Sequence, residues 1–212
     1  MPRIYCTEQV HAEAFGHADF EEQQEEQEQE QQFEPAPHVS AAGDLGFTAV
    51  SEQYYDVSGN GTVLCSLKNP TYRPALCHST VMSSGRNCAE FTLLRKPGEV
   101  MVGVGRPTLD VNEARAQQTA DFWGVYSGRG DVHHAGTVVQ PLQGNIRSQP
   151  FSEGDVLRLL LDSEAGSLTL KMNGILLGVV VASGLTGDLC WTVSCFGTYN
   201  EMRIQLVDPS NF

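Results

Sequence analysis

The sequence lacks the signatures of a membrane-bound or exported protein. No run approaches the ~18 apolar residues that a membrane helix needs, and the opening MPRIYCTEQVHAEAF has no apolar core of a secretory signal. Without a sign of export, we expect an intracellular, cytoplasmic chain. In that reducing compartment we expect the six cysteines to be unpaired and mostly buried thiols.

Positive charge is also scarce. Lys and Arg number 13 against 26 Asp and Glu, for a net charge of -13. Residues 1–39 hold ten of these acids against Arg3 alone, so this segment carries -9 and the remainder only -4. Neither part offers a basic stripe for phosphates or anionic lipid headgroups. The charges therefore predict no binding to nucleic acid and no docking on membranes.

Catalytic and metal-binding patterns are missing as well. There is no G-x-S-x-G, P-loop, H-E-x-x-H or C-x-x-C motif. Cys65, Cys77 and His78 could be zinc ligands, but their spacing is unlike that of structural zinc sites. His133 and His134 have no nucleophile or acid near them in sequence, so we expect His134 to be packed or to cap a loop. The sequence predicts no enzyme, no metal and no cofactor.

A strongly biased segment lies near the N-terminus. Residues 21–32 read EEQQEEQEQEQQ, which cannot bury enough apolar surface to offset the entropy of ordering. Pro35 and Pro37 would end any helix there. We expect residues 1–39 to be a disordered Glu/Gln-rich tail, an inert linker in preference to an interaction arm. One monomeric domain then covers residues 40–212, beginning near Ser40.

From Ser40 onward, short apolar runs alternate with Gly, Pro, Asn and Asp, a pattern typical of strands joined by turns. The predicted strands are 63–67, 90–94, 100–104, 156–161, 167–172, 175–181, 191–196 and 202–207. Asn173 and Gly174 can supply the positive φ angles of a tight hairpin. Only residues 110–122 look helical, with Asp110 and Glu113 placed for a capping box, and we interpret them as a helical turn or lid loop. The pattern predicts an all-β antiparallel sandwich.

Four segments, in order, resemble the SPRY domain family. They are SSGRNCAEFTLL (83–94), VMVGVGRP (100–107), DFWGVYSGRGDVHHAG (121–136) and FSEGDVLRLLLDSEAGSLTLKMNGILLGVVV (151–181). LCWTVSCFG (189–197) is similar to the last core strand of that family. The resemblance covers about residues 47–209 and implies a concanavalin-like jelly-roll sandwich.

The residues that carry this resemblance suit structural roles. Asp155 and Asp162 are placed to accept hydrogen bonds from local backbone amides. Gly166 and Gly174 can adopt positive φ angles. Trp123 offers a large apolar body that we expect to cover one end of the sandwich.

The resemblance implies an adaptor-like protein-binding module without catalytic activity, which holds a peptide or loop of a partner on loops at one end of the sandwich. The first loop is NPTYRPA, with Tyr72 and Arg73. The second contributes Arg106, Pro107, Thr108 and Asn112. The third is FGTYNE, with Phe196, Thr198 and Tyr199. Peptide-binding relatives carry Trp-Gly in the third loop, where this chain has Gly197-Thr198, so their peptide motif is not expected here.

The sequence is also compatible with other functions. A narrower form of the same hypothesis makes the chain the substrate-recognition subunit of a ubiquitin ligase, although it has no RING-like Cys/His array. A carbohydrate-binding sandwich is the main alternative. A divergent hydrolase is the weaker one, because Asp162 and Glu164, its only close carboxylate pair, fall in a predicted turn.

Overall fold

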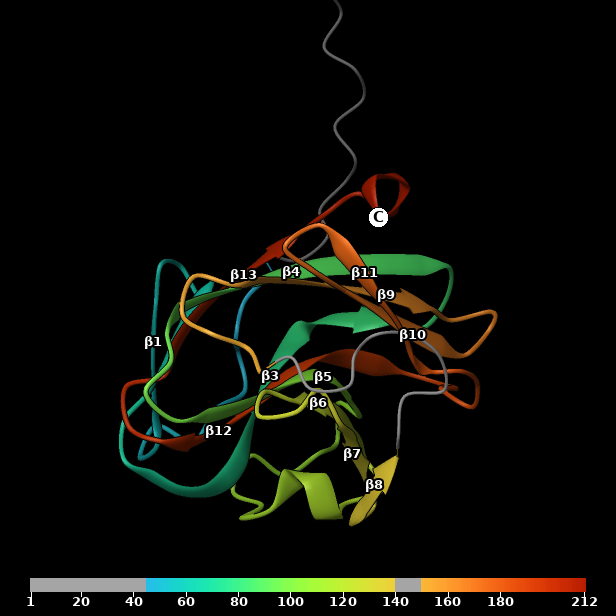
Figure 1. Cartoon of the computed structure of the whole chain (residues 1–212). Coiled ribbons are helices and arrows are strands. Elements are labelled where there is room, and N and C mark those ends of the chain that lie inside the picture. Colours follow the sequence, from blue (N-terminus) through green and yellow to red (C-terminus); the bar gives the residue numbers. More distant parts are fainter. Residues whose placement is uncertain (1–44, 140–149) are drawn as a thin grey trace, which may run out of the picture. The chain divides into compact units, whose positions relative to one another are not determined.

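The computed structural model describes residues 45–139 and 150–212. Within them, two antiparallel β-sheets are stacked as the layers of a sandwich (Figure 1). The predicted all-β sandwich is confirmed. The predicted tail, the boundary at Ser40 and Cys6 lie outside the described residues.

One layer has seven strands in the order β1-β2-β13-β4-β9-β10-β11. Their bounds are Tyr55–Ser58 (β1), Val63–Ser66 (β2), Arg86–Arg95 (β4), Val156–Asp162 (β9), Ser167–Met172 (β10), Ile175–Val181 (β11) and Glu201–Leu206 (β13).

The other layer has six strands in the order β3-β12-β5-β6-β7-β8. Their bounds are Asn69–Met82 (β3), Glu99–Gly105 (β5), Phe122–Tyr126 (β6), Val132–His134 (β7), Thr137–Val139 (β8) and Leu189–Gly197 (β12).

The main hydrophobic core lies between the sheets. Side chains alternate along β12, so Trp191, Val193 and Cys195 face this core. Phe91 of β4 meets Trp191 edge to face, with ring centroids 6.2 Å apart. Both rings are fully buried, so the contact joins the two layers at their centre.

The longest strand, β3, was missed by sequence reasoning. Pro70 and Pro74 lie in it, which made residues 69–75 look like a loop. Proline is tolerated because β3 is the edge strand of its sheet. Residues 48 and 49 cover part of its outer edge, where the Thr48 and Ala49 N–H groups donate to the Leu76 carbonyl at 3.0 and 3.1 Å.

Residues 110–122 were interpreted as a helical turn or lid loop, and a single helical turn is confirmed. This short 3₁₀ helix, η1, spans Ala116–Gln118, and the rest is turn or irregular, apart from the bridge at Arg115 and from Phe122, which begins β6. The capping box does not form: Asp110 accepts from the Asn112 N–H at 2.9 Å, and no side chain caps η1. Asp110 thus closes a local turn, which competes with helix formation.

The turn chemistry agrees with the sequence. Asn173 and Gly174 have φ angles of 51° and 79°, as a tight hairpin requires. Asp155 Oδ2 accepts from the Ser152 N–H at 2.6 Å. Asp162 Oδ1 accepts from the N–H groups of residues 164 and 165 at 3.1 and 2.9 Å, so the carboxylate proposed for hydrolysis stabilises its own turn.

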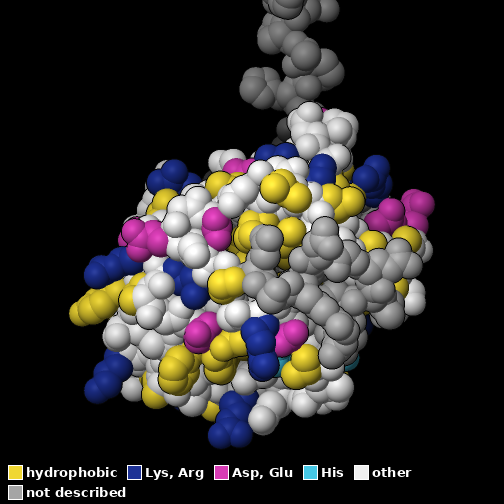
Figure 2. All heavy atoms as spheres, in the orientation of Figure 1, with side chains coloured by type: hydrophobic (Ala, Val, Ile, Leu, Met, Phe, Trp, Pro, Cys, Tyr) yellow, Lys and Arg dark blue, Asp and Glu magenta, His cyan; other side chains and the backbone are white. Residues whose placement is uncertain are grey.

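The surface and the thiols agree with the composition. Lys and Arg are scattered singly on the face in Figure 2, with Asp and Glu among them. No helix within residues 45–139 and 150–212 is long and apolar enough to cross a membrane. Four of the described cysteines are buried and Cys65 is partly buried, all as free thiols.

Candidate functional site

The candidate site lies on the outer face of the six-stranded sheet, away from the main core. A second hydrophobic cluster covers part of this face and consists of Leu76, Met101, Leu109, Ala116, Phe122 and Cys190. Leu109 and Ala116 belong to the segment between β5 and β6, which passes below β6 in Figure 1. Leu109 and Ala116 pack in this cluster with Phe122 of β6, and this packing holds the covering segment against the sheet. The Phe122 ring needs glycine two residues along the strand, because a Cβ atom on Gly124 would lie 2.4 Å from it.

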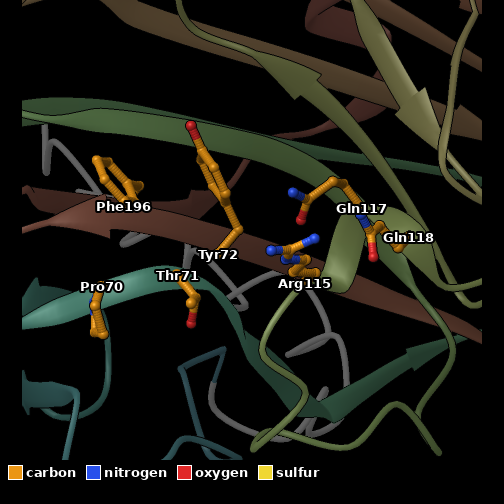
Figure 3. A pocket seen from close by; sticks show the side chains of 7 residues that line it. All are labelled: Pro70, Thr71, Tyr72, Arg115, Gln117, Gln118 and Phe196. Carbon is orange, nitrogen blue, oxygen red and sulfur yellow. The ribbon is translucent and has the colours of Figure 1, made fainter.

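A pocket with a volume of about 300 Å³ opens at the edge of the covering segment. It is lined by Pro70, Thr71 and Tyr72 of β3, Phe196 of β12, and Arg115, Gln117 and Gln118 beside or within η1. Its two sides therefore come from the sheet and from the covering segment (Figure 3).

The sheet side of the pocket is an aromatic wall. The rings of Tyr72 and Phe196 stack with centroids 5.4 Å apart and an interplanar angle of 27°. Tyr126 supports Tyr72 from behind in an edge contact at 6.5 Å. Phe196 is 41% exposed, which is high for an aromatic ring held in place by packing. Burial raises the pKa of Tyr72 well above its ordinary value, so the phenol stays neutral.

The opposite side of the pocket is polar. Arg115 is joined to Tyr72 by an isolated β-bridge, so the backbones of the two walls are tied together. In Figure 3 the side chains of Arg115 and Gln117 both point toward Tyr72. Gln117 Oε1 is buried and accepts no hydrogen bond from the described residues.

The Tyr55 hydroxyl positions β3 against β12 below the aromatic wall. It donates to the Arg73 carbonyl at 2.5 Å and accepts from Cys195 N at 3.0 Å and Asn69 Nδ2 at 3.1 Å. The β3–β12 register shifts between Cys195 and residue 197. The hydroxyl thus supplies hydrogen bonds where the ladder is interrupted, next to Phe196.

Asn200 fixes the other side of Phe196. Its Nδ2 donates to the Phe196 carbonyl at 3.0 Å, and its Oδ1 accepts from the Gly98 N–H at 2.9 Å. A Cβ on Gly98 would lie only 2.3 Å from the Phe196 oxygen, so this turn needs glycine. The backbone that presents Phe196 is therefore held from two directions.

Sequence reasoning named two residues that line this pocket, Tyr72 and Phe196. Its assignment of Tyr72 and Arg73 to a loop is wrong, because both lie in β3. Arg73 lies outside the pocket lining: its guanidinium carbon is 3.9 Å from the Tyr54 ring centroid, and Nη1 donates to Thr71 Oγ1 at 2.5 Å.

The other predicted contact residues also lie outside the lining of this pocket. Arg106 lies over the Trp123 ring and donates to the carbonyls of Thr186 and Asp188, so it fastens one loop to another. Thr108 and Asn112 are exposed on the covering segment. Thr198 and Tyr199 follow Phe196 in the β12–β13 turn, where the Tyr199 ring lies 5.3 Å from Arg95.

Five lining residues were not named from the sequence: Pro70, Thr71, Arg115, Gln117 and Gln118. Pro70 and Thr71 lie in NPTYRPA, which was predicted as the first binding loop, and the last three lie in the segment interpreted as a helical turn or lid loop. The sequence signal that could have indicated a binding site was this group of one cation and two amides between two apolar strands.

His133 and His134 pack against aromatic rings. His134 Nδ1 lies 3.0 Å from the Phe122 carbonyl and therefore donates to it, and the ring stacks on Trp123 at 4.4 Å. This confirms the packed role predicted for His134. Burial lowers the pKa of His133, whose ring meets Tyr126 edge to face. Among the described residues, no three His, Cys, Asp or Glu side chains are grouped to hold a metal ion.

Comparison with known proteins identifies one family, and many solved structures have a similar fold. A family model described as the SPRY domain matches residues 90–206, more than half of the chain. The SPRY domain of human HERC1 is similar at 20% identity and a TM-score of 0.58, over 76% of this chain and 99% of that one. The PSpry domain of TRIM65 is similar at 16% identity and a TM-score of 0.56, over 75% of this chain and 88% of that one. No curated protein in the comparison matches the chain.

Proposed function

Because the chain belongs to the SPRY domain family, whose members are generally protein–protein interaction modules, we propose that it captures an extended segment of a partner protein without catalysing a reaction. The pocket between the Tyr72–Phe196 wall and the η1 segment is the proposed contact surface. The observation that carries this proposal is Phe196, a large ring left 41% exposed although its backbone is fixed on both sides.

Two physical arguments support a peptide as the ligand. Exposed aromatic residues on a rigid support supply much of the affinity at protein interfaces, because they bury a large area with little loss of conformational entropy. The volume of about 300 Å³ is at the small end for ligand pockets and suits one or two side chains of a peptide. Tyr199 and Thr198 continue from Phe196 and would extend the surface beyond the pocket.

Affinity capture with the full chain as bait tests the proposal. Phe196→Ala removes the exposed ring, and Leu206→Ala is its matched control, since Leu206 is 47% exposed on β13 of the other sheet. We expect a set of proteins that the wild type and Leu206→Ala capture equally and Phe196→Ala loses. Overlapping peptides from such a partner should then bind the wild type. Equal capture by Phe196→Ala and the wild type would refute the surface.

The narrower form, recognition of substrates for a ubiquitin ligase, makes a different prediction in the same experiment. Ligase subunits would bind away from the pocket, so Phe196→Ala should still capture them while it loses the substrates. Loss of every captured protein with Phe196→Ala would argue against this form.

A further inference from the structure

We infer that the pocket selects a peptide segment whose aromatic or aliphatic side chain is flanked by Asp or Glu, with Arg115 as the partner of the carboxylate. This inference rests on the proposed function and adds the chemistry of the ligand. It follows from the charge and hydrogen-bonding groups that the pocket leaves unused.

The first observation is an unpaired cation in the pocket. The ion pairs among the described residues are Arg129–Asp131 and Arg158–Glu90, so Arg115 has no carboxylate partner there. Glu113 is the nearest acid in sequence, but its Oε1 accepts from the backbone N–H of Arg115 at 3.1 Å. Arg115 is the single charged residue of the lining. The pocket is therefore complementary to one negative charge.

The second observation concerns the acids on the sheet side. Glu99 is the cross-strand neighbour of Phe196, and its Oε2 accepts from the Ser127 hydroxyl at 2.9 Å. Ser127 Oγ in turn accepts from the Val100 N–H at 3.0 Å, so the carboxylate is held toward β6. Glu99 is not among the lining residues and forms no ion pair with Arg115, although its negative charge adds to the effect of burial in raising the pKa of Tyr72.

The third observation is the buried oxygen of Gln117. A buried acceptor without a donor costs about 1–3 kcal/mol. An extended peptide crossing the pocket carries backbone N–H groups, one of which could donate to Gln117 Oε1. The carboxylate for Arg115 and the N–H for Gln117 are both supplied by an acidic residue of the ligand.

The geometry also determines which ligand residue meets which side of the pocket. The β-bridge places the backbone of Arg115 beside that of Tyr72, and in Figure 3 the Arg115 guanidinium lies next to the Tyr72 side chain. A ligand residue that packs on Tyr72 and Phe196 would therefore place its neighbour at Arg115. Arg115 is exposed, so its contact with a carboxylate would add selectivity for an acidic residue more than affinity, which the aromatic wall would supply.

The test is selection of a random peptide library on the full wild-type chain, followed by affinity measurement for the enriched peptides. We expect enrichment of Asp or Glu next to an apolar residue. Arg115→Gln should weaken binding about two- to fivefold, as loss of an exposed ion pair does. Arg115→Lys should keep part of the affinity. Arg203→Gln, which removes an exposed arginine from β13 of the other sheet, should have no effect.

Salt gives an independent measure, because ion pairs are screened as ionic strength rises. The affinity of the wild type should fall between low and high salt, while that of Arg115→Gln stays nearly constant.

The outcomes separate the two proposals. Peptides that need Phe196 but lack acids, or bind Arg115→Gln as tightly as the wild type, would overturn the inference and leave the proposed function standing. If no enriched peptide loses affinity with Phe196→Ala, the proposed function is refuted and the inference falls with it.

Discussion

At the scale of single residues, the site depends on polar groups that sit behind the aromatic wall. The Tyr55 hydroxyl makes three hydrogen bonds in a fully buried position, one as donor and two as acceptor. No apolar side chain could replace them, since they join β1, β3 and β12. Asn200 plays the same part on the far side of Phe196.

We therefore predict that Tyr55→Phe lowers the free energy of unfolding by about 1–3 kcal/mol, because it leaves the buried Cys195 N–H and Arg73 carbonyl without a partner. Urea denaturation followed by the fluorescence of buried Trp191 measures this change. Tyr54→Phe removes a hydroxyl from a partly buried neighbour and should change stability much less. An equal loss in the two variants would contradict the role given to Tyr55.

At the scale of secondary structure elements, turn chemistry decided the hairpins. Asn173 holds the β10–β11 turn at a φ of 51°, its Oδ1 accepts from the Val156 N–H at 2.9 Å, and its Nδ2 donates to Asp155 at 2.8 Å. The side chain thus links the hairpin to the start of β9.

Asn173→Ala should cost about 1–2 kcal/mol of stability, because it removes these hydrogen bonds and places a residue that disfavours positive φ in the turn. Thermal unfolding monitored by circular dichroism gives the comparison. Asn173→Gly is the informative partner: it loses the same hydrogen bonds but tolerates the backbone, so it should be less destabilised. If both variants melt at the wild-type temperature, the hairpin does not depend on Asn173.

The sequence was sufficient where local rules dominate and insufficient where tertiary contacts override them. Strands 167–172 and 175–181 were predicted with their observed bounds, because the Asn173-Gly174 turn fixes where the first strand ends and where the second begins. Strand β3 could not be predicted in the same way. Its prolines at 70 and 74 are acceptable only in an edge strand, and whether a strand lies at the edge of its sheet is not a local property of the sequence. The helical turn at η1 was predicted, but the packing of this segment with Phe122 was not, because that contact is also tertiary.

In the site, too, local sequence features could be predicted and tertiary contacts could not. Tyr72 and Phe196 were found through the resemblance to a family, since exposed aromatic residues in corresponding segments are visible in sequence. Arg115 and Gln117 were missed because their place depends on the bridge between Arg115 and Tyr72, which joins residues 43 positions apart.

At the scale of the whole molecule, the described residues hold a core that is continuous across both sheets. Residues 1–39 lie outside the described residues, and the sequence predicts that they form a disordered tail. Deletion of that segment should therefore leave a cooperative unfolding transition with nearly the same midpoint in urea. A broad or absent transition in the shortened chain would show that the tail contributes to the fold.

The buried thiols predict how the stability of the whole molecule depends on pH. Burial raises the pKa of Cys190 to about 11 and that of Cys195 to about 12, so both stay protonated in the folded protein well into the alkaline range. In the unfolded chain they would ionise near the ordinary value of about 8.5. The folded state then holds protons that the unfolded state releases, so their contribution is complete below pH 8.5 and is lost as the pH rises toward the folded values.

We accordingly expect the free energy of unfolding to be flat around pH 7 and to fall above about pH 8.5, by up to about 1.4 kcal/mol per pH unit for each such thiol. Urea titrations at pH 7.5, 8.5, 9.5 and 10.0, under a reducing agent, measure the slope. Cys190→Ala removes one of these groups and should reduce the slope, whatever its effect on stability at neutral pH. Cys65→Ala, at a partly exposed position, should reduce it less. A stability that stays constant up to pH 10 would contradict the raised pKa values of these buried thiols.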